Sequence, residues 1–208
     1  MQKPFEFPRK IILGSNSPRR RELLSAMGIE FTVDTDNSFI ETVPDGTPAG
    51  QVPVILSRGK SHGFHRPLLP DELLITADTV VILPDGKEGV IFGKPKDRND
   101  ALSMLHALSG RTHEVITAVC LRTLDLEYCF TDSTKVHFAA LSDSEAEYYT
   151  DKFRPFDKAG AYGIQEWIGH IGIEWIDGSY NNVVGFPTQK LWKALQERFS
   201  CISLRRAS

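Results

Sequence analysis

The chain has 208 residues, of which 41% are hydrophobic, and a formal net charge of −3. A length of this order predicts a single domain over residues 1–208 that is large enough for its own core. The charge provides no general attraction for a nucleic-acid polymer, and no apolar run approaches the ~20 residues of a membrane span. The polar start of the chain is unlike a signal peptide. The three cysteines, an odd count without a CxxC motif, argue against a disulfide framework or a zinc cluster and predict a reducing, cytoplasmic setting.

Hydrophobic periodicity and turn residues predict that strands and helices are mixed along the chain. In chain order, the expected elements are a strand at Lys10–Ser15, a helix at Pro18–Met27, a short strand at Glu30–Asp34, a loop at Asn37–Gly50, a helix at Pro53–Phe64, a strand at Leu73–Leu83, a turn at Pro84–Gly86, a short strand at Val90–Phe92, a helix at Asp97–Leu108, paired strands at His113–Arg122 and Cys129–Ala140, a helix at Ser142–Lys152, a loop at Arg154–Gln165, a strand near Gly172–Asp177 and a closing helix at Pro187–Phe199. This mixture predicts an α/β or α+β sheet with helices on both faces.

The first strand and the first helix meet at a turn of small residues that is suited to hold an anion. The first N–H groups of a helix have no partner within it, and the helix dipole is positive there. Ser17 suits the N-cap and Pro18 the first helical position, while Arg19 adds a forked cation at the mouth. Taken alone, these residues fit a solvated helix start equally well.

Asp78 interrupts the most apolar run of the chain, Leu73–Leu83. Burying an ionised carboxylate there is costly without a cation, a metal or several donors. Ligands bind at strand ends in open α/β sheets. We therefore favour a role for Asp78 in binding a metal or activating water over the alternative, a bulge at the strand end with Asp78 in solvent. Glu41, between apolar neighbours in the first long loop, is a second candidate ligand for a hard cation such as Mg²⁺ or Mn²⁺. By itself, Glu41 fits a surface loop better.

Three lysines occupy positions from which they could reach a polyphosphate. Lys60 follows Leu56 at the helical period, Lys94 lies between a glycine and a proline that restrict the backbone, and Lys158 precedes a small-residue segment. A solvated side chain is the alternative for each of them. Only their convergence, together with Arg19, would favour polyphosphate binding.

Several common catalytic motifs are missing from the sequence. Gly93-Lys94-Pro95 is not a Walker-type loop, because Pro95 stands where serine or threonine is required. The chain also has no GxGxxG after a strand, no GxSxG and no HExxH. These absences argue against kinases, P-loop NTPases, dehydrogenases, serine hydrolases and zincins.

Taken in order, the segments described above resemble the Maf family of nucleoside triphosphate pyrophosphatases. The matching segments are Ser15–Arg20, Glu41, Lys60, Ala77–Val81, Gly93–Pro95, Ser109-Gly110 with His113–Val115, Asp157–Gln165 and Gly178–Pro187. Each segment is short, but the ordered set spans Ile11 to Leu195. The resemblance implies an elongated α/β fold with a core at residues 9–198. In this fold a mixed sheet is flanked by helices around a central cleft, as in the inosine triphosphatase-like (Ham1-type) pyrophosphatases.

The resemblance also implies a metal-dependent enzyme that cuts between the α and β phosphates of a nucleoside triphosphate, with Mg²⁺ or Mn²⁺ as the cation. Asp78 falls on the family's proposed general base and, with Glu41, would hold the metal. Whether Asp78 acts as base, as ligand or as both stays open. Arg19, Thr79 and Gln165 fall on the positions that determine specificity. The residues that would bind the phosphates are Ser15, Ser17, Arg19, Lys60, Lys94 and Lys158.

Gln165 bears on the choice of base. An amide offers a donor and an acceptor together, which suits the imide edge of uracil or thymine. This version of the motif resembles the branch that acts on dTTP and UTP, with modified pyrimidine nucleotides as further substrates. Glu166-Trp167 departs from the family's pattern, because many relatives have a small residue after the glutamine. The resemblance further implies a small-molecule nucleotide as the partner, no polymer, no membrane and a homodimer.

Two other functions stay open at this point. One is a non-catalytic nucleotide-binding regulator of cell division and septum formation, and the other is a pyrophosphatase of the same fold with purine specificity. The presence of Asp78 and Glu41 together with Lys60 and Lys94 favours catalysis, because a pure binder needs no pair of carboxylates. Gln165 argues against purine specificity.

Overall fold

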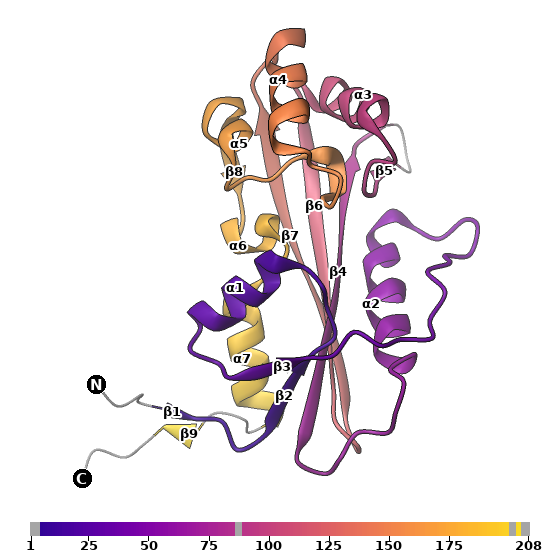
Figure 1. The fold of residues 1–208 in the computed structure, drawn as a ribbon, viewed down its shortest axis with the longest axis vertical. Coiled ribbons are helices and arrows are strands. Elements are labelled where there is room, and N and C mark those ends of the chain that lie inside the picture. Colours follow the sequence, from indigo (N-terminus) through magenta and orange to yellow (C-terminus); the bar gives the residue numbers. More distant parts are fainter. Residues whose placement is uncertain (1–4, 86–88, 200–202, 205–208) are drawn as a thin grey trace.

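The computed structural model describes residues 5–85, 89–199 and 203–204. A seven-stranded mixed sheet runs along the molecule in the order β3–β2–β4–β6–β7–β8, with β5 added beside β4 (Figure 1). Its strands are β2 (Lys10–Leu13), β3 (Phe31–Val33), β4 (Glu72–Leu83), β5 (Val90–Phe92), β6 (Thr112–Arg122), β7 (Glu127–Phe138) and β8 (Ile173–Asp177). β2 is parallel to β3 and β4, whereas the other pairs are antiparallel. β1 (Phe5–Glu6) pairs separately with β9 (Ser203–Leu204).

Helices flank this sheet and give an elongated molecule (Figure 1). They are α1 (Pro18–Ala26), α2 (Val52–His62), α3 (Arg98–Leu108), α4 (Asp143–Phe153), α5 (Trp167–Gly172), α6 (Tyr180–Val184) and α7 (Thr188–Phe199), with short 3₁₀ turns η1 (Ala49–Gln51) and η2 (Ala159–Ala161). None of the helices within the described ranges is long and apolar enough to cross a membrane. The predicted class, a mixed sheet flanked by helices, is confirmed.

β4 contributes side chains to the apolar clusters on both faces of the sheet, because successive residues of a strand point to opposite faces. On one face Ile75 packs with α1 and α7, and farther along Val81 packs with α3 and α4. On the opposite face Val80 and Ile82 pack with Val52 of α2. Each such buried side chain stabilises the fold by ~1.5–3 kcal/mol. Of the stretch Thr76–Thr79, only Ala77 belongs to one of these apolar clusters.

The strands and helices expected from hydrophobic periodicity are all present, with slightly shifted ends. The sequence pattern missed α5 and α6, because short segments rich in glycine and asparagine have no clear helical period. It also treated Arg154–Gln165 as a plain loop, although η2 lies within it. The predicted turn at Pro84–Gly86 extends past Asp85 into a part of the chain outside the described residues.

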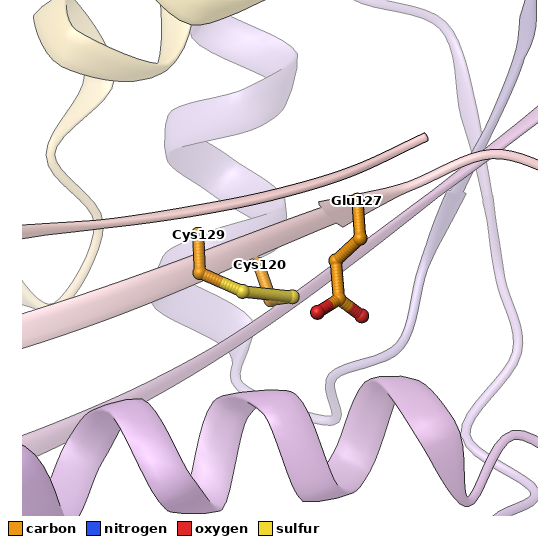
Figure 2. Close-up of side chains that lie close together, drawn as sticks. All are labelled: Cys120, Glu127 and Cys129. Carbon is orange, nitrogen blue, oxygen red and sulfur yellow. A yellow bond between two sulfur atoms is a disulfide. The ribbon is translucent and has the colours of Figure 1, made fainter. Parts of the chain in front are cut away.

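A disulfide joins Cys120 of β6 to Cys129 of β7 (Figure 2). The two residues are directly opposite in the antiparallel register, with Cα atoms 4.1 Å apart. The expectation drawn from the cysteine count missed this pair, because chain spacing alone does not show that a tight hairpin places two cysteines face to face. Glu127 lies beside the sulfur atoms and pairs with Arg58 and His62. Since the S–S bond uses both thiols, this group of side chains is not arranged as a metal centre.

Candidate active site

A cavity of about 500 Å³ opens where β4 passes the ends of its neighbours. β2 pairs with β4 only as far as Ile75, and β5 pairs with it only from Val81. Between these points β6 is the only strand among the described residues that pairs with β4, and the other edge of β4 faces the cavity. An open strand edge leaves polar backbone groups that must find other partners. The site is therefore built where the sheet itself is incomplete.

Asp78 lies on this open stretch of β4 and contacts Lys60 of α2. The Lys60 ammonium is 2.6 Å from Asp78 Oδ1 and 3.0 Å from Glu41 Oε1. The Asp78 and Lys60 side chains are only 15% and 21% exposed, whereas Glu41 is 58% exposed. One cation thus holds two carboxylates together at the mouth of the cavity. This contact explains how a carboxylate is accommodated in the most apolar run of the chain.

The loop that carries Glu41 is fixed on α2 by its aromatic neighbour. Gly59 leaves a notch for the Phe39 ring, since a Cβ at this position would lie 2.2 Å from Phe39 Cζ. Asn37 adds a hydrogen bond from its side-chain amide to the Lys60 carbonyl and accepts one from the Phe39 N–H at 2.8 Å. Because the same helix carries Gly59 and Lys60, this packing brings the Glu41 carboxylate to the Lys60 ammonium.

Arg20, at the start of α1, provides hydrogen-bond donors for the edge of β4 that no strand covers. Its guanidinium donates to the Ala77 carbonyl at 2.8 Å, to Ser15 Oγ at 3.2 Å, to Thr79 Oγ1 at 3.1 Å and to the Gly185 carbonyl at 3.0 Å. Burial lowers the pKa of Arg20 to about 10, so the group stays charged at neutral pH. Sequence reasoning missed this role, because three consecutive arginines at a helix start are typical of a solvated surface.

The α1 N-terminus presents small residues and Arg19 to the cavity. Pro18 occupies the first helical position as predicted, whereas Ser17 caps through its backbone conformation without a side-chain hydrogen bond. Instead, the Ser17 N–H donates to Ser15 Oγ at 3.3 Å. Arg19 does not point free into the cavity, because its Nη1 donates to Asp157 Oδ2 at 2.7 Å.

Successive ion pairs lie along the part of the cavity wall that contains Asp157 and Lys158. The Lys158 ammonium is 2.7 Å from Asp157 Oδ1 and 3.0 Å from Glu166 Oε1, and its side chain is only 9% exposed. Burial acts to raise the pKa of Asp157, but the hydrogen bonds from Lys158 and Arg19 outweigh it and hold this pKa below the ordinary value. Lys94 also lines the cavity, is exposed, and pairs with no described carboxylate. Of the two lysines, Lys94 is the one without an ion pair to another described residue.

Thr79 and Gln165 lie on the cavity wall between these charged groups. Thr79 Oγ1 accepts from Arg20 and lies 3.0 Å from Thr117 Oγ1, so both sides of its hydroxyl are engaged. Gln165 Oε1 is buried and has no hydrogen-bond partner in the described part of the chain. A buried acceptor without a donor is costly, and a bound ligand can remove that cost.

Tyr162, which lines the cavity, forms a buried pair of rings with His113 behind it, and the sequence did not indicate this contact. His113 Nε2 lies 2.7 Å from the Tyr162 hydroxyl, and both rings pack against Phe138. Burial, assisted by the neighbouring His137, lowers the pKa of His113 to about 3. This imidazole is therefore neutral at physiological pH and takes part in packing.

The residues named from the sequence as site candidates all line this cavity: Ser15, Ser17, Arg19, Glu41, Lys60, Asp78, Thr79, Lys94, Lys158 and Gln165. The convergence that sequence could not establish is thus present. The contacts also show which of these residues are already paired within the protein and which can still bind a ligand. Lys60 and Lys158 are held by carboxylates of the protein, whereas the amide oxygen of Gln165 is free to accept from a ligand.

Comparison with known proteins identifies the family of this chain. The dTTP/UTP pyrophosphatase of Phocaeicola vulgatus is 50% identical over 188 residues, which cover 90% of this chain and 95% of the relative. The dTTP/UTP pyrophosphatase of Bacteroides fragilis is 47% identical over the same shares of both chains. Among solved structures, the Ham1 protein of Staphylococcus aureus aligns over 91% of this chain and 98% of its own, with a TM-score of 0.49 and 16% identity. Residues 10–198 match the family described as Maf-like protein. The chain belongs to the Maf family.

Proposed function

We propose that this chain is a nucleoside triphosphate pyrophosphatase that hydrolyses dTTP and UTP, and modified pyrimidine nucleotides, to the nucleoside monophosphate and pyrophosphate. The observation that carries the proposal is that the candidate phosphate, metal and base residues line a single cavity. The names of the relatives, which are about half identical over nine tenths of this chain, support the choice of dTTP and UTP. We also propose that the substrate is a free nucleotide and that the enzyme works as a homodimer, as the family resemblance implies. A cytoplasmic setting belongs to the same proposal, but the Cys120–Cys129 disulfide removes the support that the cysteine count gave it.

In the reaction, a water oxygen bonds to the α-phosphorus while the bond from this phosphorus to the α,β-bridging oxygen breaks. Pyrophosphate leaves, and the water proton passes to Asp78. Lys60 holds Asp78 Oδ1, so Oδ2 is the atom assigned to accept the proton. A positioned general base contributes roughly 10²–10⁴ in rate. Lys94 and the N–H groups at the start of α1 receive the charge of the departing phosphates.

The donor set suits a hard divalent cation. Glu41 and Asp78 lie close enough together to contact one ammonium, each through one oxygen, and carboxylate oxygens are the ligands that Mg²⁺ and Mn²⁺ prefer. When bound, such a cation would neutralise phosphate charge and acidify the attacking water. Lys60 keeps the two carboxylates together against their mutual repulsion.

The test is pyrophosphate release from a panel of dTTP, UTP, dCTP, GTP, ITP and ATP, each with Mg²⁺, with Mn²⁺ and with EDTA. We expect turnover led by dTTP and UTP, and its loss in EDTA. Turnover led by a purine nucleotide would overturn the pyrimidine assignment. Binding without turnover of any nucleotide would instead support a non-catalytic regulator. Turnover undiminished by EDTA would refute the requirement for a divalent cation.

A further inference from the structure

Glu166 lies immediately after Gln165, at the N-cap of α5. Both of its carboxylate oxygens are engaged. Oε1 is 3.0 Å from the Lys158 ammonium, and Oε2 accepts from the Tyr149 hydroxyl. The Glu166 side chain is 21% exposed, so this is a largely buried carboxylate with a charged partner and a neutral one. Nothing in the hydrolytic chemistry requires it.

Through Tyr149 the carboxylate also fixes the backbone that leads to Gln165. The Gly163 N–H donates to the Tyr149 hydroxyl at 3.0 Å, and the Glu166 N–H donates to the Gly163 carbonyl at 3.0 Å. A Cβ at Gly163 would lie 3.0 Å from Glu166 Cδ and 3.1 Å from Lys158 Cε. The turn from Gly163 to Glu166 is therefore closed tightly around the carboxylate, and Gln165 is part of that turn.

In the other direction the contacts continue to Arg19. Lys158 bonds Asp157 at 2.7 Å, and Asp157 bonds Arg19 at 2.7 Å. Positive and negative groups alternate along Arg19, Asp157, Lys158 and Glu166, so the run is neutral as a whole. Its two ends are the positions that the family resemblance associates with substrate specificity, Arg19 at one end and the turn bearing Gln165 at the other.

We propose that Glu166 is a positioning residue for the base pocket. Its carboxylate locks Lys158 and the Gly163–Glu166 turn, and so holds the Gln165 amide where it can meet the imide edge of a pyrimidine. The buried, unpartnered Gln165 Oε1, which lacks a donor among the described residues, is the acceptor available to the imide N–H. This inference rests on the proposed function, because it assigns the basis of the pyrimidine preference.

Glu166→Gln tests the inference with almost no change of shape. The glutamine has only one oxygen, so it can accept from Tyr149 or from Lys158 but not from both, and the charge that pairs with the Lys158 ammonium is lost in either orientation. We expect the affinity for a pyrimidine nucleotide to fall about tenfold, which is the size of one lost charge-assisted hydrogen bond. The affinity for a purine nucleotide should change less than about twofold, so the discrimination falls. KM for dTTP should rise while kcat stays within about twofold, because the chemistry does not use Glu166.

The experiment is isothermal titration of the full chain, in Mg²⁺, with the α,β-imido analogues of dTTP and of GTP. Wild type, Glu166→Gln and the exposed control Glu147→Gln are compared, with thermal melts to establish folding. Tyr149→Phe removes the hydroxyl that joins Glu166 to Gly163, and it should cause a similar loss. In the double variant the two losses should not add.

Equal discrimination by wild type and Glu166→Gln, or a loss shared by Glu147→Gln, would overturn the inference. If Glu166→Gln does not fold, Tyr149→Phe decides in the same way. A wild type that binds the dTTP analogue but does not hydrolyse dTTP would refute the proposed function, while the ratio of affinities would still decide the role of Glu166. A wild type that binds neither analogue would overturn both.

Discussion

Asp78→Asn separates the role of Asp78 in the reaction from its role in the fold. The substitution keeps the shape of the side chain and removes its charge, so the Lys60 ammonium loses a partner at 2.6 Å. Lys60 keeps Glu41 at 3.0 Å. Removing one member of a buried ion pair costs roughly 3–5 kcal/mol. Because a second carboxylate remains and the pair is partly exposed, we expect a loss of only about 1–2 kcal/mol in the free energy of unfolding.

The effect of Asp78→Asn on turnover should be much larger. Loss of a general base and of one ligand to a cation should lower kcat about 1,000-fold, or about 4 kcal/mol of transition-state stabilisation. The assay is pyrophosphate release from dTTP, with urea unfolding of the same preparations. Asp71→Asn is the matched control, since it breaks an exposed pair of 2.9 Å between Asp71, just before β4, and Lys10, and it should alter neither quantity appreciably. Near wild-type kcat in Asp78→Asn would refute the assignment of Asp78.

Three further perturbations test the parts around the site. Gly59→Ala places a Cβ 2.2 Å from the Phe39 ring and should displace the loop that carries the second carboxylate, lowering kcat/KM for dTTP about tenfold or more in steady-state assays. His113 has its pKa lowered to about 3 by burial, so the unfolded chain binds its proton more readily than the folded one. Between pH ~6.5 and pH ~5, above the range where the carboxyl groups titrate, the free energy of urea unfolding should therefore fall by up to about 1.4 kcal/mol per pH unit, a slope that His113→Gln should lack. Reducing the Cys120–Cys129 disulfide with a dithiol, which opens a link across a sequence separation of 9, should cost about 2.5 kcal/mol and lower the melting temperature.

Each of these expectations has a control within the chain. Gly50→Ala adds a Cβ whose nearest neighbour is Ile116 Cδ1 at 3.7 Å, so it should leave kcat/KM unchanged. Equal effects of Gly50→Ala and Gly59→Ala would contradict the claim that Gly59 makes room for the Phe39 ring. His170 is exposed, and its replacement by glutamine should preserve the pH slope. A variant with serine in place of both bonded cysteines should melt at the same temperature with and without the dithiol.

Periodicity predicted the long strands and helices well, because burial on one face imposes a repeat that the sequence shows directly. Asp78 could be singled out for the same reason, as a charge inside an apolar run. Where Asp78 finds its cation could not be predicted, since Lys60 reaches it only after α2 packs on β4. Arg20 was missed because its burial depends on the open edge of β4, which is a property of the sheet and not of the local sequence.

Contacts between distant segments account for the remaining differences. The pairing of Cys120 with Cys129 depends on the register of two strands, which spacing along the chain does not give. The role of Lys158 changed for a similar reason. The family resemblance implies that Lys158 binds phosphate, but the structure surrounds its ammonium with two carboxylates. Only the packing shows that Lys158 is paired with carboxylates, whereas Lys94 has no ion pair with another described residue.

The measurement that tests the central claim most directly is ³¹P nuclear magnetic resonance of the products formed from dTTP in ¹⁸O-labelled water. Attack at the α-phosphorus predicts dTMP and pyrophosphate as products, with the ¹⁸O in dTMP. The Asp78→Asn protein, run in parallel, should form neither at a comparable rate. Formation of dTDP and orthophosphate, or of pyrophosphate that carries the ¹⁸O, would contradict a pyrophosphatase that cuts between the α and β phosphates.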